Sequence, residues 1–123
     1  LVLLGIEIED AKEDALWLAS KIATLRIFSD EKGVMNKSIT ELGGEVIVVS
    51  QFTLHAKTKK GNRPSYIKAA RPEQAIPLYE QFKKNLSKAI GSEVQSGEFG
   101  TDMKVSLIND GPVTIIIDTK NKD

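Results

Sequence analysis

Two stretches of the chain place apolar residues at the spacing of an α-helix. In the first, apolar positions recur every three or four residues from Ala11 to Leu25, with Asp10 before them as the expected N-cap. In the second, Pro72 stands at an early helical position and Gly91 follows the last apolar residue. The pattern predicts two long helices, whose apolar faces are formed by Ala11, Ala15, Leu18, Ile22 and Leu25 and by Ala75, Tyr79, Phe82, Leu86 and Ile90.

Shorter apolar segments predict β-strands. The run Val46–Val49 indicates a strand that is buried on both faces, and Met103–Ile108 alternates apolar with polar residues, as a half-buried strand does. Together these elements predict one α/β domain over residues 1–123, of the α+β-like kind, with two helices packed on a mixed or mostly antiparallel sheet. The strands are expected at Leu1–Ile8, Glu45–Leu54, Glu93–Ser96, Met103–Ile108 and Val113–Asp118.

Composition excludes several classes of protein. The chain has no cysteine, so disulfides and thiolate chemistry are excluded, and its single histidine, His55, is too few for a histidine-rich zinc site. We therefore expect no metal and no cofactor. The apolar runs are too short to span a bilayer, and no signal-peptide pattern is present. These features favour a cytoplasmic location without membrane insertion.

The first residues read as the interior of a core strand, because Leu1-Val2-Leu3-Leu4 has no polar residues before it. Such a strand normally pairs with a neighbour. We expect the domain to lack its N-terminal strand or hairpin.

Charge is distributed unevenly. The chain has 17 basic and 17 acidic residues, but residues 55–71 contain six cations and no acid, so the rest of the chain has a net charge of −6. A local polyanion contact would need such a cationic loop, although a solvated loop with no ligand explains the same run. The six cations are Lys57, Lys59, Lys60, Arg63, Lys68 and Arg71.

Two polar clusters occur where predicted strands end. Ser50-Gln51-Phe52-Thr53 could supply donors to the oxyanion of an ester under hydrolysis, or could simply hydrogen-bond neighbouring strand ends. A hydroxyl nucleophile also needs a base, and His55 shares the strand face of Thr53 without necessarily meeting its hydroxyl. By local rules the second cluster, Asn109–Thr114, is a turn with a trans Gly-Pro bond.

Taken together, the two clusters resemble the two signature motifs of the D-aminoacyl-tRNA deacylase family, formerly called D-tyrosyl-tRNA deacylases. Further landmarks agree in order and spacing, so the resemblance covers essentially the whole chain. They are Arg26-Ile27-Phe28-Ser29-Asp30, Gly43-Gly44, Arg63-Pro64-Ser65, Gly97-Glu98-Phe99 and Asp102-Met103-Lys104-Val105-Ser106-Leu107.

The resemblance implies a barrel-like sheet, a homodimer and a chiral proofreading hydrolase that acts on D-aminoacyl-tRNA and glycyl-tRNA. It implies that a cis Gly111-Pro112 peptide, within the motif from Asn109 to Thr114, enters the partner's site and excludes L-amino acids by steric clash. Ser50, Gln51, Phe52 and Thr53 would line the catalytic pocket. The Phe52 N–H would be an oxyanion donor. Either Thr53 or the 2′-hydroxyl of the terminal adenosine would assist the reaction, and we favour the latter. Phe99 and Met103 would complete the pocket.

The expected partner is therefore aminoacyl-tRNA, with no DNA, and the tRNA contacts are expected at Lys57, Lys59, Lys60, Arg63 and Lys68. Two alternatives remain open at this point. One is a non-catalytic tRNA-binding module that uses the cationic loop. The other is an editing module of the kind appended to some archaeal threonyl-tRNA synthetases, which removes L-serine.

Overall fold

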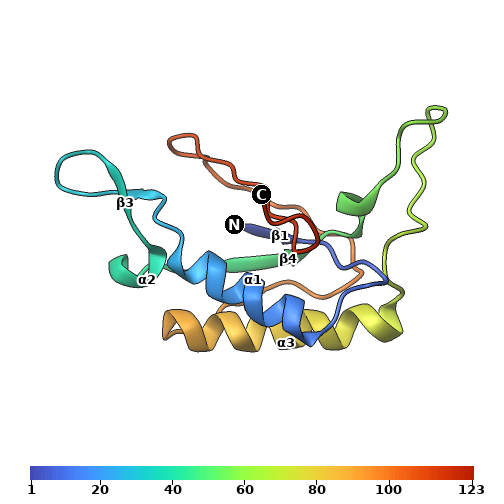
Figure 1. Cartoon of the computed structure of the whole chain (residues 1–123), viewed down its shortest axis with the longest axis horizontal. Helices are drawn as coiled ribbons and strands as arrows, with labels where there is room; N and C mark the ends of the chain where they lie inside the picture. Colours follow the sequence, from blue (N-terminus) through green and yellow to red (C-terminus); the bar gives the residue numbers. More distant parts are fainter.

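The computed structural model describes all 123 residues and shows a mixed α/β fold (Figure 1). Two long helices confirm the helical prediction, and a third, short helix was not predicted. In chain order the elements are β1 (Val2–Leu4), α1 (Lys12–Thr24), β2 (Phe28–Ser29), β3 (Met35–Lys37), α2 (Ile39–Leu42), β4 (Ile47–Ser50), the 3-10 helix η1 (Phe52–His55), α3 (Pro72–Ile90) and β5 (Gln95–Ser96).

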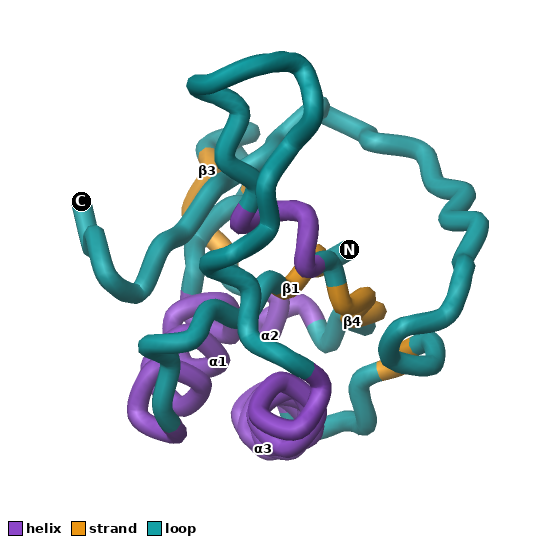
Figure 2. The backbone as a smooth tube through the Cα atoms, turned by 90° about the vertical axis from the view of Figure 1, so that its right-hand side faces the viewer, coloured by secondary structure: helices purple, strands orange, loops and turns teal.

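The main sheet has three parallel strands in the order β1-β4-β5, and β2 and β3 form a separate antiparallel pair. The prediction of a mixed fold is confirmed, whereas a mostly antiparallel sheet is wrong for the main sheet. Parallel neighbours need long crossover connections. Helix α1 lies in the connection from β1 to β4, and α3 lies in the connection from β4 to β5. Both helices lie on the same side of the sheet (Figures 1 and 2).

Helix α3 supplies most of the core, as its pattern predicts. All five residues of its apolar stripe are buried, and Phe82 and Leu86 are at most 1% exposed. Pro72 stands in its first turn, and Gly91 ends it in the left-handed conformation with φ of 78°. The stripe packs against Val48 of β4 and the other core residues, Leu4, Ile6, Ala19, Ala23, Val46 and Val94. None of the helices is long and apolar enough to cross a membrane.

The predicted face of α1 is only partly correct. Its fully buried residues are Ala19 and Ala23, which the predicted stripe omits, because small side chains let α1 and α3 approach closely where they pack. The N-cap is the exposed Ala11, and the carboxylate of Asp10 instead accepts a hydrogen bond from the Glu7 N–H at 2.9 Å. Ala15, Leu18 and Ile22 pack at the edge of the core.

Strand β4 is buried at Val48 on one face and at Val49, 5% exposed, on the other, so the prediction of burial on both faces is correct except at Ile47. The side chain of Val48 is fully buried under the helices, whereas Ile47 on the opposite face is 42% exposed. The helices cover the face of Val48, whereas the opposite face is covered at Val49 and open at Ile47. The strand also ends at Ser50, because the chain then turns into η1 instead of continuing to Leu54.

Residues 103–117, which we call the C-terminal arm, form no strand, so the two strands predicted at Met103–Ile108 and Val113–Asp118 are wrong. An alternating pattern makes a strand only where another backbone lies within hydrogen-bonding reach, and the arm extends away from the sheet instead (Figure 1). Most of its apolar side chains are consequently exposed, Ile108 and Ile116 to 91% and 94%, and only Met103 and Ile117 are half-buried.

The core can be tested by truncating Leu86, which is fully buried. We expect Leu86→Ala to lower the free energy of unfolding by about 2–5 kcal/mol, because the substitution leaves a cavity that packed neighbours enclose. Leu16→Ala, at a 58% exposed position of α1, is the control and should change it by about 0.5 kcal/mol or less. Urea denaturation measures both, and equal effects would contradict this description of the core.

Candidate active site

The first polar cluster follows the end of the central strand. Ser50 pairs with Leu4 in the parallel register, and the Gln51 N–H donates to the Leu4 carbonyl at 2.8 Å. The next residues turn into η1, where the Leu54 N–H donates to the Gln51 carbonyl at 3.2 Å. The side-chain amide of Gln51 donates a hydrogen bond to the hydroxyl of Thr53. The cluster therefore forms a tight polar turn at the carboxyl end of β4.

A cavity of about 260 Å³ opens beside this turn. It brings Ser50, Gln51 and Phe52 together with Phe99 and Met103, five residues that the sequence placed in one site. All of them follow the carboxyl ends of parallel strands, which is where open α/β sheets bind ligands. Apolar side chains make most of the remaining wall, which includes Leu4, Ile6, Val49, Ala70, Ala75 and Val105. The cavity can thus hold an apolar or flat group against the polar strand end.

Thr53 lies outside the lining of this cavity, and no base accompanies it. Its hydroxyl oxygen accepts the hydrogen bond from Gln51, while the Nδ1 atom of His55 lies 3.9 Å from the Glu7 carboxylate. No hydrogen bond joins His55 to Thr53. A threonine hydroxyl without a base is a weak nucleophile at neutral pH.

The second cluster, residues 109–114, lies at the exposed tip of the C-terminal arm, where the chain turns back. The Gly111-Pro112 peptide bond is cis, and Gly111 has a φ of 140°, a conformation that favours glycine. The Asn109 amide reaches the Thr114 hydroxyl across the turn at 3.4 Å. In Figure 1 the arm points away from η1, so one chain does not bring this cluster to its own cavity.

The cationic loop, residues 57–71, leaves the body beside η1 and rises to the far right of Figure 1. Its ends are held by two isolated bridges, Lys57 with Ser65 and Glu7 with Ala69. All five cations that the sequence assigned to tRNA binding are exposed, and none forms an ion pair within the chain; they are Lys57, Lys59, Lys60, Arg63 and Lys68.

Sequence reasoning missed Tyr66, which lies in this loop. Its ring meets the ring of Phe52 edge to face, with centroids 5.0 Å apart. The two residues are fourteen positions apart, and the contact depends on how the loop folds back, so no periodicity in the sequence signals it.

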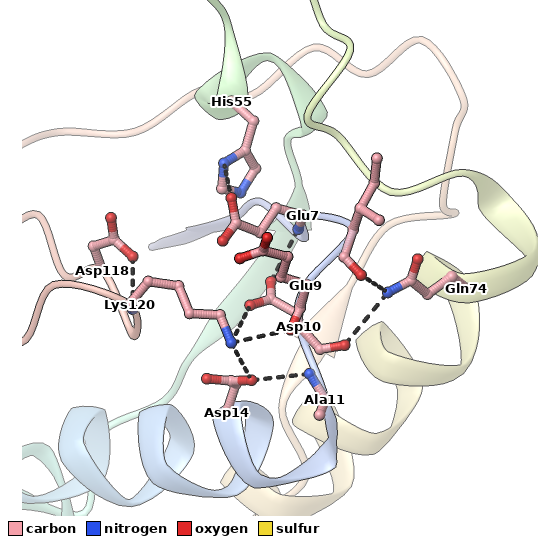
Figure 3. A network of polar contacts seen from close by, with 10 residues as sticks. Glu7, Glu9, Asp10, Ala11, Asp14, His55, Gln74, Asp118 and Lys120 are labelled. Atoms are coloured by element: carbon pink, nitrogen blue, oxygen red, sulfur yellow. Dashed lines mark hydrogen bonds and ion pairs between the residues drawn. The ribbon is translucent and has the colours of Figure 1, made fainter.

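Sequence reasoning also missed a polar network at the base of the C-terminal arm (Figure 3). The ammonium of Lys120 donates to the Asp14 carboxylate at 2.9 Å and to the Glu9 carbonyl at 3.0 Å, and it lies 3.8 Å from Asp10. Asp10 and Asp14 also line a second cavity of about 230 Å³. Residues more than 100 positions apart meet here, and the chain has no His, Asp or Glu group arranged to hold a metal ion.

The network shifts three pKa values. Burial raises the pKa of Asp10 above its ordinary 3.8, although the Glu7 N–H donates a hydrogen bond to this carboxyl. Burial also acts to raise the pKa of Asp14, but hydrogen bonds from Ala11 and Lys120 outweigh it, so the pKa is lowered. The bond to Asp14 raises the pKa of Lys120. The ion pair between Asp14 and Lys120 therefore stays charged at neutral pH.

The geometry defines a class of protein, an α/β fold with a cavity at the carboxyl ends of parallel strands. The family model described as D-Tyr-tRNA(Tyr) deacylase matches residues 1–118. A Bacteroides thetaiotaomicron protein named D-aminoacyl-tRNA deacylase is 68% identical over 123 residues, the whole of this chain and 82% of that protein. A Flavobacterium johnsoniae protein of the same name is 62% identical with the same coverage. The chain belongs to the D-Tyr-tRNA(Tyr) deacylase family.

Solved structures share the fold. One described as c-Myc DNA unwinding element binding protein is 41% identical, with a TM-score of 0.85 over 92% of this chain and 76% of that chain. Another, described as a probable eukaryotic D-amino acid tRNA deacylase, is 17% identical, with a TM-score of 0.65 over 80% of this chain and 72% of the other. The second likeness concerns the fold alone.

The network around Lys120 predicts a pH dependence of stability. The pKa of Asp14 is lower in the folded than in the unfolded chain, so its charge adds stability above about pH 3.8, and this is lost as the pH falls through the folded value. We expect Asp14→Asn to be less stable than wild type at neutral pH, with the gap closing at acid pH in urea denaturation. Glu13→Gln, exposed on the same turn, is the control for losing one charge. A gap that persists at acid pH would contradict the ion pair.

Proposed function

We propose that this chain hydrolyses the ester bond of D-aminoacyl-tRNA in the cytoplasm, releasing the free D-amino acid and tRNA. The observation that carries the proposal is the cavity in which Ser50, Gln51 and Phe52 meet Phe99 and Met103. These residues come from two segments about fifty positions apart, in a chain 68% identical to a relative named for this activity. No cofactor takes part in the proposed reaction.

In this proposal the cavity receives the terminal adenosine and its amino acid. Phe99 and Met103 supply the apolar wall against which a base packs, while the polar strand end faces the ester. The Phe52 N–H donates to the carbonyl oxygen as it becomes an oxyanion. A donor in such a position typically lowers the barrier by roughly 3 kcal/mol.

Water is activated by the substrate in this proposal, through the 2′-hydroxyl of the terminal adenosine. The support for this route consists of observations against the alternative, in which Thr53 is the nucleophile. Thr53 lies outside the cavity lining, its oxygen accepts from Gln51, and His55 faces Glu7 instead. Thr53 then holds the Gln51 amide in place and does not attack the ester.

Selectivity comes from the Gly111-Pro112 peptide of a second copy of the chain. Its carbonyl oxygens hold the amino group of the substrate and leave no space for an L side chain, whereas D-amino acids and glycine fit. Two observations support a homodimer that completes the site. The tip of the arm, beyond the cavity-lining Met103 and Val105, points away from η1, and apolar residues on either side of the Gly-Pro turn are exposed: Leu107, Ile108, Ile115 and Ile116.

The first test of this function compares enantiomers. We expect hydrolysis of D-aminoacyl-tRNA and glycyl-tRNA, with the L-ester spared because it clashes with the Gly-Pro peptide. We expect Pro112→Ala to raise cleavage of the L-ester by about tenfold or more, which is a loss of about 1.4 kcal/mol of discrimination. Lys104→Ala, an exposed change in the same arm, is the matched control. Deacylation rates measure the effect, and sedimentation velocity reports the oligomeric state.

Other outcomes would identify other functions. Equal rates on both enantiomers would remove chiral selection. Cleavage of L-seryl-tRNA would indicate an editing module like that of archaeal threonyl-tRNA synthetases. A non-catalytic tRNA-binding module would lose its function when Lys59, Lys60 and Arg63 are neutralised and keep it in Thr53→Ala and Pro112→Ala.

The second test separates the two routes to hydrolysis. We expect Thr53→Ala to keep kcat within about tenfold of wild type, because a missing nucleophile would cost far more. A tRNA whose terminal adenosine lacks the 2′-hydroxyl should be a poor substrate for both proteins, because its water is not activated. Single-turnover rates of both proteins on both substrates decide between the two routes. Loss of activity in Thr53→Ala together with normal cleavage of the 2′-deoxy substrate would establish Thr53 as the nucleophile.

A further inference from the structure

An exposed aromatic pair lies at the edge of the candidate cavity. Phe52 is 55% exposed and Tyr66 is 37% exposed, and their rings contact each other edge to face, with planes at 74°. An edge-to-face contact uses only one face of one ring. Phe52 also lines the cavity, so the pair extends the cavity wall outward toward the cationic loop.

The backbone holds Tyr66 in place on both sides. Immediately before it, Ser65 exchanges two hydrogen bonds with Lys57, at 2.8 and 3.0 Å. After it, the Ala69 N–H donates to the Tyr66 carbonyl at 3.0 Å, and the Ile8 N–H donates to the Lys68 carbonyl at 3.1 Å. Tyr66 is therefore presented by an ordered segment, and a ligand would pay little ordering cost to use it.

The segment that carries Phe52's partner Tyr66 is cationic, and residues 55–71 contain no acid. Lys57 and Lys68 flank Tyr66 on the two sides of the loop, and Arg63 precedes it by three residues. None of these side chains is engaged in an ion pair. Exposed aromatic rings among free cations are the features that bind single-stranded nucleic acid, where bases stack on the rings and phosphates meet the charges.

We propose that Tyr66, supported by Phe52, is a stacking site for the nucleotide that precedes the terminal adenosine of a single-stranded RNA 3′ end. This inference rests on the proposed function, which puts the terminal adenosine in the cavity. Because Phe52 contacts both the cavity and Tyr66, a strand leaving the cavity meets the Tyr66 ring at its next nucleotide, and its phosphates then follow the loop cations.

The experiment compares two substrates in the full chain: a D-aminoacyl-tRNA and the same amino acid esterified to adenosine alone. We expect Tyr66→Ala to lower kcat/KM for the tRNA ester about tenfold, mainly through KM, because one base loses its stacking partner. Hydrolysis of the adenosine ester should be unchanged, since it has no preceding nucleotide. Tyr66→Phe should keep the wild-type rate, whereas Tyr66→Leu should behave like Tyr66→Ala. Ile67→Ala, at a 69% exposed neighbour, is the matched control.

Equal losses on both substrates would overturn the inference, because Tyr66 would then act within the cavity or on the fold. An unchanged rate of Tyr66→Ala on the tRNA ester would overturn it as well. If the wild-type chain cleaves neither ester, the proposed function fails. Titration with the uncharged trinucleotide CCA then tests the stacking site separately: weaker binding by Tyr66→Ala supports it, and equal binding overturns it.

Discussion

One buried hydrogen bond joins the helical layer to the sheet and to the candidate site. The hydroxyl of Tyr79, a side chain that is 1% exposed, donates to the carbonyl of Val48 at 3.2 Å. The same ring packs against Phe99 with centroids 5.6 Å apart. A buried hydroxyl without a partner would cost about 1–3 kcal/mol, so the bond fixes the position of α3 relative to β4 at this point. Tyr79 thereby also sets the position of one wall of the cavity relative to Ser50.

The sequence predicted best those features that depend on one segment and its burial. The stripe of α3 is correct throughout, because a long helix with one apolar face has a single way to bury it. The stripe of α1 failed at Ala19 and Ala23, since small residues carry little hydrophobic signal but allow close packing. The prediction of strands in the arm was wrong for a different reason. An alternating pattern shows that a segment is able to pair as a strand, but the rest of the fold has to supply the backbone with which it pairs.

The candidate site was predictable only in part, for a related reason. Ser50, Gln51, Phe52, Phe99 and Met103 were grouped through the resemblance to a family, and the structure puts them around one cavity. Tyr66 and Lys120 were missed, because each acts through contacts between distant segments that leave no periodic trace. The Gly111-Pro112 turn is absent from the cavity lining, and the tip of the arm that carries it points away from η1 (Figure 1), so the contacts within a single chain do not join the two.

The distribution of the core along the chain has a consequence for the newly made protein. Every residue of the main core cluster lies between Leu4 and Val94, and the arm contributes none. During synthesis the helices and the sheet can therefore close while the arm is still inside the ribosome. The turn that carries Gly111 and Pro112 would then be added to a body that is already folded, and Lys120, which follows the arm in the chain, would fasten the arm to α1.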